Sequence, residues 1–169
     1  MRMLTKTTTH ILALLLSLWL SGCSTIQSIN ESMPWHSGNE VESIALQVKF
    51  DAQLQHAVSV DVVFVYDDNL IALLSNASAA QWFMEKKGYM ANYGINMDII
   101  HREIVPGYSE SIVELPDRHK DAKSVIAFAL YPQNPNAKAD LTLLATPWLL
   151  FDAQQMQVAA AAPTTPGVK

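Results

Sequence analysis

Short segments in which apolar residues occupy every second position are the feature that most constrains the fold of this chain. In residues 44–50 these positions are Ile44, Leu46, Val48 and Phe50. In residues 58–66 they are again apolar, and most of the segment is valine. Successive side chains of a strand point to opposite faces, and β-branched residues suit a pleated surface. Both segments are therefore predicted to be β-strands.

Similar segments follow along the chain, separated by residues typical of turns. They are residues 97–105, 109–115, 124–131, 139–145 and 148–151. The Pro106-Gly107 pair predicts a tight turn, and so a hairpin of residues 97–105 with 109–115. Residues 124–131 are apolar on both faces and are predicted to be the most buried strand, with residues 139–145 as its antiparallel partner. This pattern predicts an all-β fold, a transthyretin-like antiparallel β-sandwich of about seven strands with a short helical insertion.

The helical insertion is predicted between the second and third strands. Asp67, Asp68 and Asn69 can cap a short helix through residue 74, and Ser78 can cap a second helix from Ala79 to about residue 92. These helices are expected to cover a sheet edge, with Glu85 and the Lys86-Lys87 pair facing solvent. The apolar side chains Trp82, Phe83 and Met90 are interpreted as core rather than as a ligand pocket.

The amino-terminal segment has the three parts of a bacterial secretion signal. Arg2 and Lys6 precede an almost wholly apolar stretch at residues 11–20, which is too short to span a membrane comfortably. The stretch closes on Leu20-Ser21-Gly22-Cys23, which resembles a lipobox, in which the cysteine receives lipid and palmitate-type acyl chains. Cys23 is the only cysteine, so no intramolecular disulfide is possible. We expect Cys23 to be lipidated, and Ser24 after it resembles an outer-membrane address facing the periplasm.

This interpretation divides the chain into four parts. Residues 1–22 are a lipoprotein signal peptide, 23–42 a flexible tether, 43–152 the β-sandwich domain and 153–169 a disordered tail. The mature chain from Cys23 keeps nine basic and all sixteen acidic residues, a formal charge of −7. Without a basic cluster, this charge argues against nucleic acid as a partner and against electrostatic docking to anionic lipid. Acyl chains are then left as the membrane anchor.

Motifs that carry catalysis or bind metal are weak in this sequence. Gly107-Tyr108-Ser109-Glu110-Ser111 begins like a nucleophile elbow, but Ser111 replaces the second glycine. The histidines at 36, 56, 101 and 119 show no zinc-binding spacing, and each is interpreted as an isolated imidazole that is either at the surface or partly packed. Glu103, Glu110 and Glu114 flank the Pro-Gly turn and are expected to be solvated. We therefore predict no enzymatic activity, no catalytic residue, no metal and no cofactor.

Several segments, taken in order, are similar to those of the type VI secretion lipoprotein family known as TssJ. They are Val62–Tyr66 at a strand end, the Trp82-Phe83 pair, Val105–Gly107 at a turn, and Val125–Tyr131 in the buried strand. The resemblance extends over residues 60–144. It implies a lipid-anchored β-sandwich with an added helical segment.

The resemblance also implies a role and a partner. It implies a non-enzymatic structural component of the type VI secretion membrane complex, located under the outer membrane, which binds the periplasmic domain of the inner-membrane protein TssM. Family members bind through loops at one end of the sandwich. By position, the loop of residues 51–57 would be the contact, through Gln53, Leu54, Gln55 and His56.

Two other hypotheses fit parts of the same pattern. A lipoprotein of another envelope assembly, such as a pilus or conjugation apparatus, would have the same anchor and a similar domain. A periplasmic ligand-binding or cell-wall-binding module would instead present Trp82, Tyr89, Tyr93 and Trp148 as exposed stacking surfaces in a concave groove. Buried rings would exclude that module.

Overall fold

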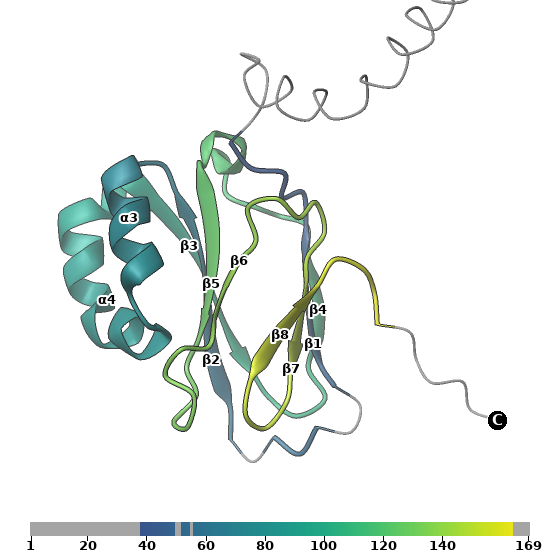
Figure 1. Cartoon of the computed structure of the whole chain (residues 1–169). Coiled ribbons are helices and arrows are strands. Elements are labelled where there is room, and N and C mark those ends of the chain that lie inside the picture. The colour runs from purple at the N-terminus through teal and green to yellow at the C-terminus, as the bar shows by residue number, and fades with distance from the viewer. Residues whose placement is uncertain (1–37, 50–51, 55, 164–169) are drawn as a thin grey trace, which may run out of the picture. The chain divides into compact units, whose positions relative to one another are not determined.

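The computed structural model describes residues 38–49, 52–54 and 56–163, in which two four-stranded sheets face each other and helices cover one of them (Figure 1). One sheet has the strand order β4-β1-β7-β8 and the other β3-β2-β5-β6. The strands are β1 Ile44–Val48, β2 Val58–Val65, β3 Met97–Ile104, β4 Ser109–Ile112, β5 Ser124–Ala129, β6 Lys138–Asp140, β7 Trp148–Phe151 and β8 Met156–Ala159. The predicted β-sandwich is confirmed.

The main core lies between the two sheets and is built from the inward positions of the alternating strands. Strand β2 contributes Val60, Val62 and Phe64, and strands β1 and β7 contribute Leu46 and Phe151. All six residues of β5 are buried, as predicted from its apolar content on both faces. The period-two pattern therefore places one face of β1, β2 and β7 in this core.

A second core lies on the outer face of the β3-β2-β5-β6 sheet, beneath the helices. The helices are α3 Asp68–Asn76 and α4 Ala79–Tyr93, followed by the short 3-10 helix η1 Gly94–Asn96. The Asp67 side chain caps α3, and Ser78 and Gln81 form a capping box on α4. Trp82 stacks on Phe128 of β5, with ring centroids 5.1 Å apart. The helices thus cover a sheet face and not the predicted edge.

The strand pairing differs from the predicted pattern in two places. Strand β4 does not form a hairpin with β3, because it crosses to the other sheet and pairs with β1. Strand β1 also pairs in parallel with β7, so its sheet is not wholly antiparallel. The turn itself is as predicted, since Gly107 has a φ of 78°. Strand β6 is the predicted antiparallel partner of β5 but covers only Lys138–Asp140.

The sandwich domain extends beyond both of its predicted boundaries, residues 43 and 152. Strand β8 lies in the predicted disordered tail, where it pairs with β7 and packs Met156 and Val158 against the core. At the other boundary, Asn39 and Val41 of the predicted tether are fully buried. The signal peptide, Cys23, residues 23–37 of the tether and residues 164–169 of the tail lie outside the described residues.

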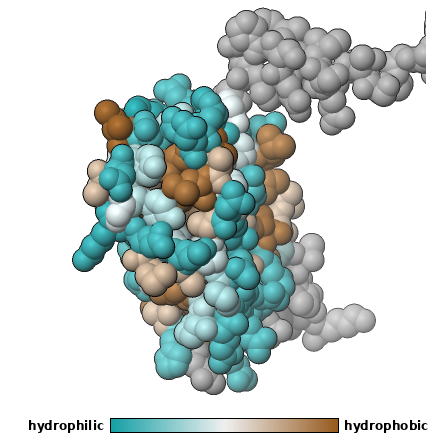
Figure 2. All heavy atoms as spheres, turned by 60° about the vertical axis from the view of Figure 1, so that its left-hand side comes forward, coloured by the Kyte–Doolittle hydropathy of each residue, from teal (hydrophilic) through white to brown (hydrophobic). Residues whose placement is uncertain are grey.

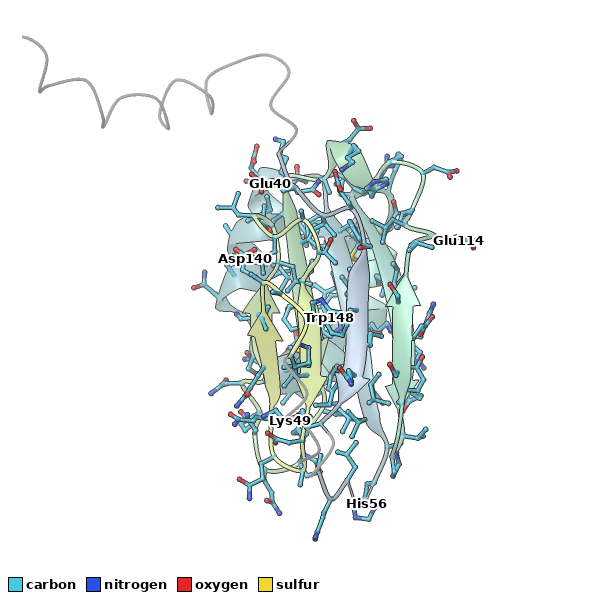
Figure 3. The ribbon with its side chains drawn as sticks, turned by 90° about the vertical axis from the view of Figure 1, so that its right-hand side faces the viewer. Glu40, Lys49, His56, Glu114, Asp140 and Trp148 are labelled. Carbon is cyan, nitrogen blue, oxygen red and sulfur yellow. The ribbon has the colours of Figure 1, made fainter. Side chains whose placement is uncertain are left out.

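The connections between strands divide into two ends of the sandwich, seen at the top and bottom of Figure 3. The proximal end, where the described chain begins and Glu40 lies, comprises residues 38–43, 66–67, 113–123 and 141–147. The distal end, where His56 lies, comprises the described residues 52–54 and 56–57 with residues 105–108, 130–137 and 152–155. Within the described residues, none of the helices has the length and apolar character needed to span a bilayer.

Candidate functional site

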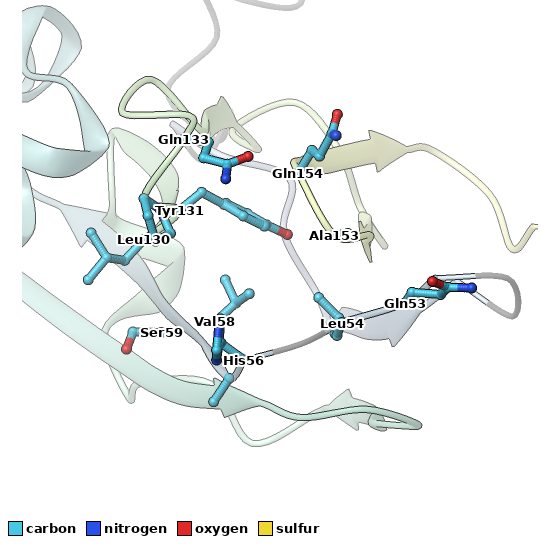
Figure 4. A pocket seen from close by; sticks show the side chains of 12 residues that line it. Gln53, Leu54, His56, Val58, Ser59, Leu130, Tyr131, Gln133, Ala153 and Gln154 are labelled. Carbon is cyan, nitrogen blue, oxygen red and sulfur yellow. The ribbon is translucent and has the colours of Figure 1, made fainter.

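A pocket of about 420 Å³ lies at the distal end, where three separate connections meet (Figure 4). Residues 53–54 and 56–59 line it on one side, residues 130–133 on another, and Ala153 and Gln154 on a third. Its apolar lining includes Leu54, Val58 and Leu130, and three side-chain amides surround it, those of Gln53, Gln133 and Gln154. None of these lining residues is Asp, Glu, Lys or Arg. Its lining suits an uncharged ligand with apolar and hydrogen-bonding groups.

Hydrogen bonds from buried groups hold the loops of this pocket in place. The Tyr131 hydroxyl donates to the carbonyl oxygens of Asp152 (3.1 Å) and Gln155 (2.9 Å), and burial, with the nearby Asp152 charge, raises the pKa of Tyr131 well above its usual range. The Asp152 carboxylate accepts from Lys49 Nζ at 2.9 Å and from the backbone N–H groups of Gln154 and Gln155. Although burial raises the pKa of Asp152, these donors lower it overall. The loop of residues 152–155 is therefore preorganised.

Three of the four contacts implied by the family resemblance lie together at this pocket. Gln53 and His56 are exposed and line it, and Leu54 also lines it but is buried in the core between the sheets. Gln55 lies outside the described residues. Sequence reasoning missed the contributions of residues 130–133 and 153–154. The Pro- and Gln-containing segment at 132–136 could have indicated a loop beside the pocket, but its position depends on tertiary structure.

A buried ionic cluster lies beneath α4, between β2, β3 and that helix. Asp61 of β2 is fully buried, and its carboxylate accepts from Trp82 Nε1 at 2.8 Å. Lys86 Nζ lies 2.8 Å from the same carboxylate, and His101 Nδ1 lies 2.7 Å from its other oxygen. A buried charge is tolerated only when it is paired and hydrogen-bonded. The cluster therefore fixes α4 to the sheet.

This cluster corrects two predictions made from the sequence. Lys86 does not face solvent freely, because it pairs with Asp61. His101 is not isolated, since its Nε2 atom also lies 3.3 Å from Glu103, and Glu103 in turn accepts from Ser59. A charged residue within a valine-rich strand was the available signal, because such a residue must find partners when both faces are covered.

The aromatic residues do not form the exposed groove that the ligand-binding hypothesis requires. Trp82 is fully buried between Phe128 and Tyr89. Trp148 lies on the sheet opposite the helices, on β7 (Figure 3). The four rings named for that hypothesis therefore do not converge on one surface.

A second polar cluster closes the side of the sandwich between β3 and β4. Arg102 donates to both carboxylate oxygens of Glu110, with an Nε–Oε2 distance of 2.9 Å, and the Tyr108 hydroxyl also donates to Glu110. The hydrogen bonds from Arg102 and Tyr108 lower the pKa of Glu110, and burial together with that carboxylate raises the pKa of Tyr108. Glu110 is thus an ion-paired residue and not the solvated carboxylate predicted.

The serines of the segment that begins like a nucleophile elbow lie in a strand. Ser109 and Ser111 are exposed residues of β4, a strand and not a strand-to-helix turn. Among the described residues, His, Cys, Asp and Glu side chains form no group of three or more that could hold a metal ion. The surface over the helices is largely hydrophilic, with hydrophobic residues in separate areas (Figure 2). The large apolar side chains of α3 and α4 that are exposed are Leu73, Met84 and Met90.

Comparison with solved structures identifies similar folds. TssJ1, a type VI secretion lipoprotein from Pseudomonas aeruginosa, has 12% sequence identity and a TM-score of 0.52, over 72% of this chain and 95% of that one. Lip of Serratia marcescens, a membrane-bound type VI component, gives a TM-score of 0.48 at 12% identity over 69% and 94%, and a chain of a type VI membrane complex gives 0.49 at 14% over 70% and 98%. No family model and no curated protein sequence matches. The similarity to TssJ1 confirms the predicted TssJ-like fold.

Proposed function

We propose that this protein is a lipoprotein of the type VI secretion membrane complex, anchored in the outer membrane by acyl chains on Cys23. Its distal end binds the periplasmic domain of the inner-membrane protein TssM. The proposal is supported by the TssJ-like fold, the lipobox-like segment before the domain and the order of the family-like motifs. The role is structural and involves no catalysis.

The observation that carries this proposal is the position of the pocket relative to the start of the domain. Asn39, at the proximal end, donates to the carbonyl oxygens of His119 (2.7 Å) and Ala122 (2.8 Å). The backbone N–H of Glu40 donates to Thr142 at 2.8 Å. The chain that leads from Cys23 thus joins the sandwich at its proximal end, and the pocket lies at the distal end (Figure 3). A domain attached in this way can present the pocket to a partner across the periplasm.

The charges of the two ends support the same orientation. The proximal end carries six acidic and three basic residues, namely Glu40, Glu42, Asp67, Glu114, Asp117, Asp121, Arg118, Lys120 and Lys123. Among the described residues of the connections at the distal end, the acidic and basic side chains are Asp152 and Lys49, which lies in the same connection as residues 52–57, and these two pair with each other. The centres of protein interfaces are depleted in charge, because charged groups are costly to desolvate. The distal end is the better suited of the two for a protein interface.

Binding to TssM can be tested directly with purified proteins. The mature chain in detergent is immobilised, and the periplasmic domain of the TssM encoded in the same genome is passed over it. Because the distal end is nearly uncharged, we expect a specific complex whose affinity changes by less than about threefold between roughly 0.05 and 0.5 M salt. Absence of a complex throughout this range would refute the proposal, and binding to a pilus or conjugation subunit instead would assign the protein to another assembly.

A further inference from the structure

The amides around the distal pocket indicate what kind of group the pocket binds. The side chains of Gln53, Gln133 and Gln154 are exposed, and they come from three connections that are far apart in the sequence. Two further hollows, of about 350 and 330 Å³, share residues with the pocket and add the amides of Asn134 and Gln155 to the same surface; the second is also lined by Lys49 and Asp152, which pair with each other. Each such amide offers both donors and an acceptor, which is also what a peptide group offers.

We propose that the pocket binds one uncharged, apolar side chain of an extended segment of the partner protein, and that the surrounding amides bind the main chain on either side of it. This inference rests on the proposed function, because it names the group by which the partner is held. The apolar lining of Leu54, Val58 and Leu130 accepts the side chain. A main chain that loses water at an interface must replace its hydrogen bonds, and the amides supply both kinds.

The lining of the pocket and the burial of Tyr131 favour an apolar peptide side chain over a charged side chain or a sugar ring. A charged side chain would lose its hydration, and the lining holds no Asp, Glu, Lys or Arg to pair with it. Sugar rings commonly stack on the open face of an aromatic ring, but Tyr131 is only 4% exposed and its hydroxyl already donates to residues 152 and 155. The pocket is therefore suited to a peptide segment and not to a glycan.

Rigidity of the site adds to this argument. The Tyr131 hydroxyl and the Asp152 carboxylate hold residues 152–155 in place before a ligand arrives. Ala153, which lines the pocket, is exposed, so a larger side chain can be placed there without disturbing the core. A preformed site loses little conformational entropy on binding, and a single anchor side chain in such a site often dominates an interface.

The test fills the pocket in the full-length protein. Ala153→Trp places a large ring against the pocket, and Ala91→Trp, on the exposed face of α4, is the matched control. The probe is a displayed library of linear random peptides, selected on the wild-type protein in detergent. We expect the selected peptides to share an apolar residue within an uncharged segment, to bind Ala153→Trp at least about tenfold more weakly and to bind Ala91→Trp unchanged. Gln133→Ala combined with Gln154→Ala should weaken the same peptides, and thermal melting confirms that each variant is folded.

Other results would overturn the inference, and they separate it from the proposed function. The anchor site would be refuted if no peptide were selected or if the selected peptides were charged. It would also be refuted if the selected peptides bound Ala153→Trp as tightly as the wild type. Purified cell-wall sacculi that bind the wild type but not Ala153→Trp would assign the pocket to a glycan instead. If the periplasmic domain of TssM binds Ala153→Trp and the wild type with equal affinity, the proposed function is retained and the anchor site is refuted. If that domain does not bind the wild type, the proposed function itself fails.

Discussion

Replacing Lys86 by methionine should destabilise the protein far more than the same change at its neighbour Lys87. Lys86 Nζ lies 2.8 Å from the carboxylate of Asp61, whose side chain has no exposed surface, and the lysine side chain itself is 25% exposed. Lys87 is exposed. Methionine keeps most of the aliphatic length of lysine, so the change mainly removes the charge. The pair Lys86→Met and Lys87→Met therefore isolates the contribution of the buried ion pair.

The size of the expected loss in stability depends on the partners that Asp61 keeps when Lys86 is replaced. Removing one partner of a buried ion pair costs about 3–5 kcal/mol. Asp61 still accepts from Trp82 at 2.8 Å, and His101 at 2.7 Å can supply a positive charge when protonated. We therefore expect a loss of roughly 2–3 kcal/mol in the free energy of unfolding for Lys86→Met, and less than about 0.5 kcal/mol for Lys87→Met. For a domain of this size the first loss corresponds to a fall in Tm of roughly 8–12 °C.

Urea denaturation followed by circular dichroism measures these changes, and a double-mutant cycle with Asp61→Asn identifies their origin. A neutral asparagine needs no counter-charge, so Lys86→Met should cost roughly 1 kcal/mol or less in that background. Equal stability of Lys86→Met and Lys87→Met, or the same cost of Lys86→Met in the wild-type and Asp61→Asn backgrounds, would refute the conclusion that a buried charge holds α4 on the sheet.

Three further predictions concern other parts of the chain. Lys138 Nζ donates to the carbonyl oxygens of Leu74, Ser75 and Ala77 at the carboxyl-terminal end of α3. Lys138→Met should therefore lower the free energy of unfolding by about 1–2 kcal/mol in urea denaturation, against less than about 0.5 kcal/mol for the exposed Lys123→Met. Because Arg102 and Tyr108 lower the pKa of Glu110 in the folded state, the stability contributed by Glu110 is present above its ordinary pKa, about 4.3, and lost as the pH falls below it. Glu110→Gln should therefore flatten the fall in Tm below about pH 4.5, and an unchanged acid profile would contradict this. Cys23→Ser should move the protein from the membrane to the soluble periplasmic fraction on cell fractionation, whereas Ser28→Ala, a small change outside the lipobox-like segment, should leave it with the membrane.

Strands β1 and β2 could be predicted from the sequence because apolar residues occupy every second position, and β5 and β7 because they are short apolar runs between turn residues. The predicted and observed bounds of β2 and β7 agree to within one residue. Strand β8 was missed because alanine, proline and threonine around it suggested disorder, although Met156 and Val158 already show the inward period. Its stability comes from pairing with β7, which is a property of the fold and not of the segment.

The pairing of β4 and the composition of the pocket also depend on tertiary structure, so neither could be predicted from the sequence. Pro106-Gly107 specifies a turn, but the same turn can join neighbouring strands or strands of opposite sheets. The choice depends on β1, which accepts β4 on one side and β7 on the other. The pocket likewise combines residues 53–59, 130–133 and 153–154, and only tertiary structure brings them together. The resemblance could indicate the first of these segments alone.

The central claim is that the distal end, and not the proximal end, binds the partner. The most direct measurement compares the affinity of the periplasmic domain of TssM for two variants of the mature chain, Gln133→Arg at the distal pocket and Asp117→Arg at the proximal end; both residues are exposed. We expect Gln133→Arg to weaken binding by at least about tenfold and Asp117→Arg to leave it unchanged. Unchanged binding by Gln133→Arg together with loss of binding by Asp117→Arg would contradict the claim.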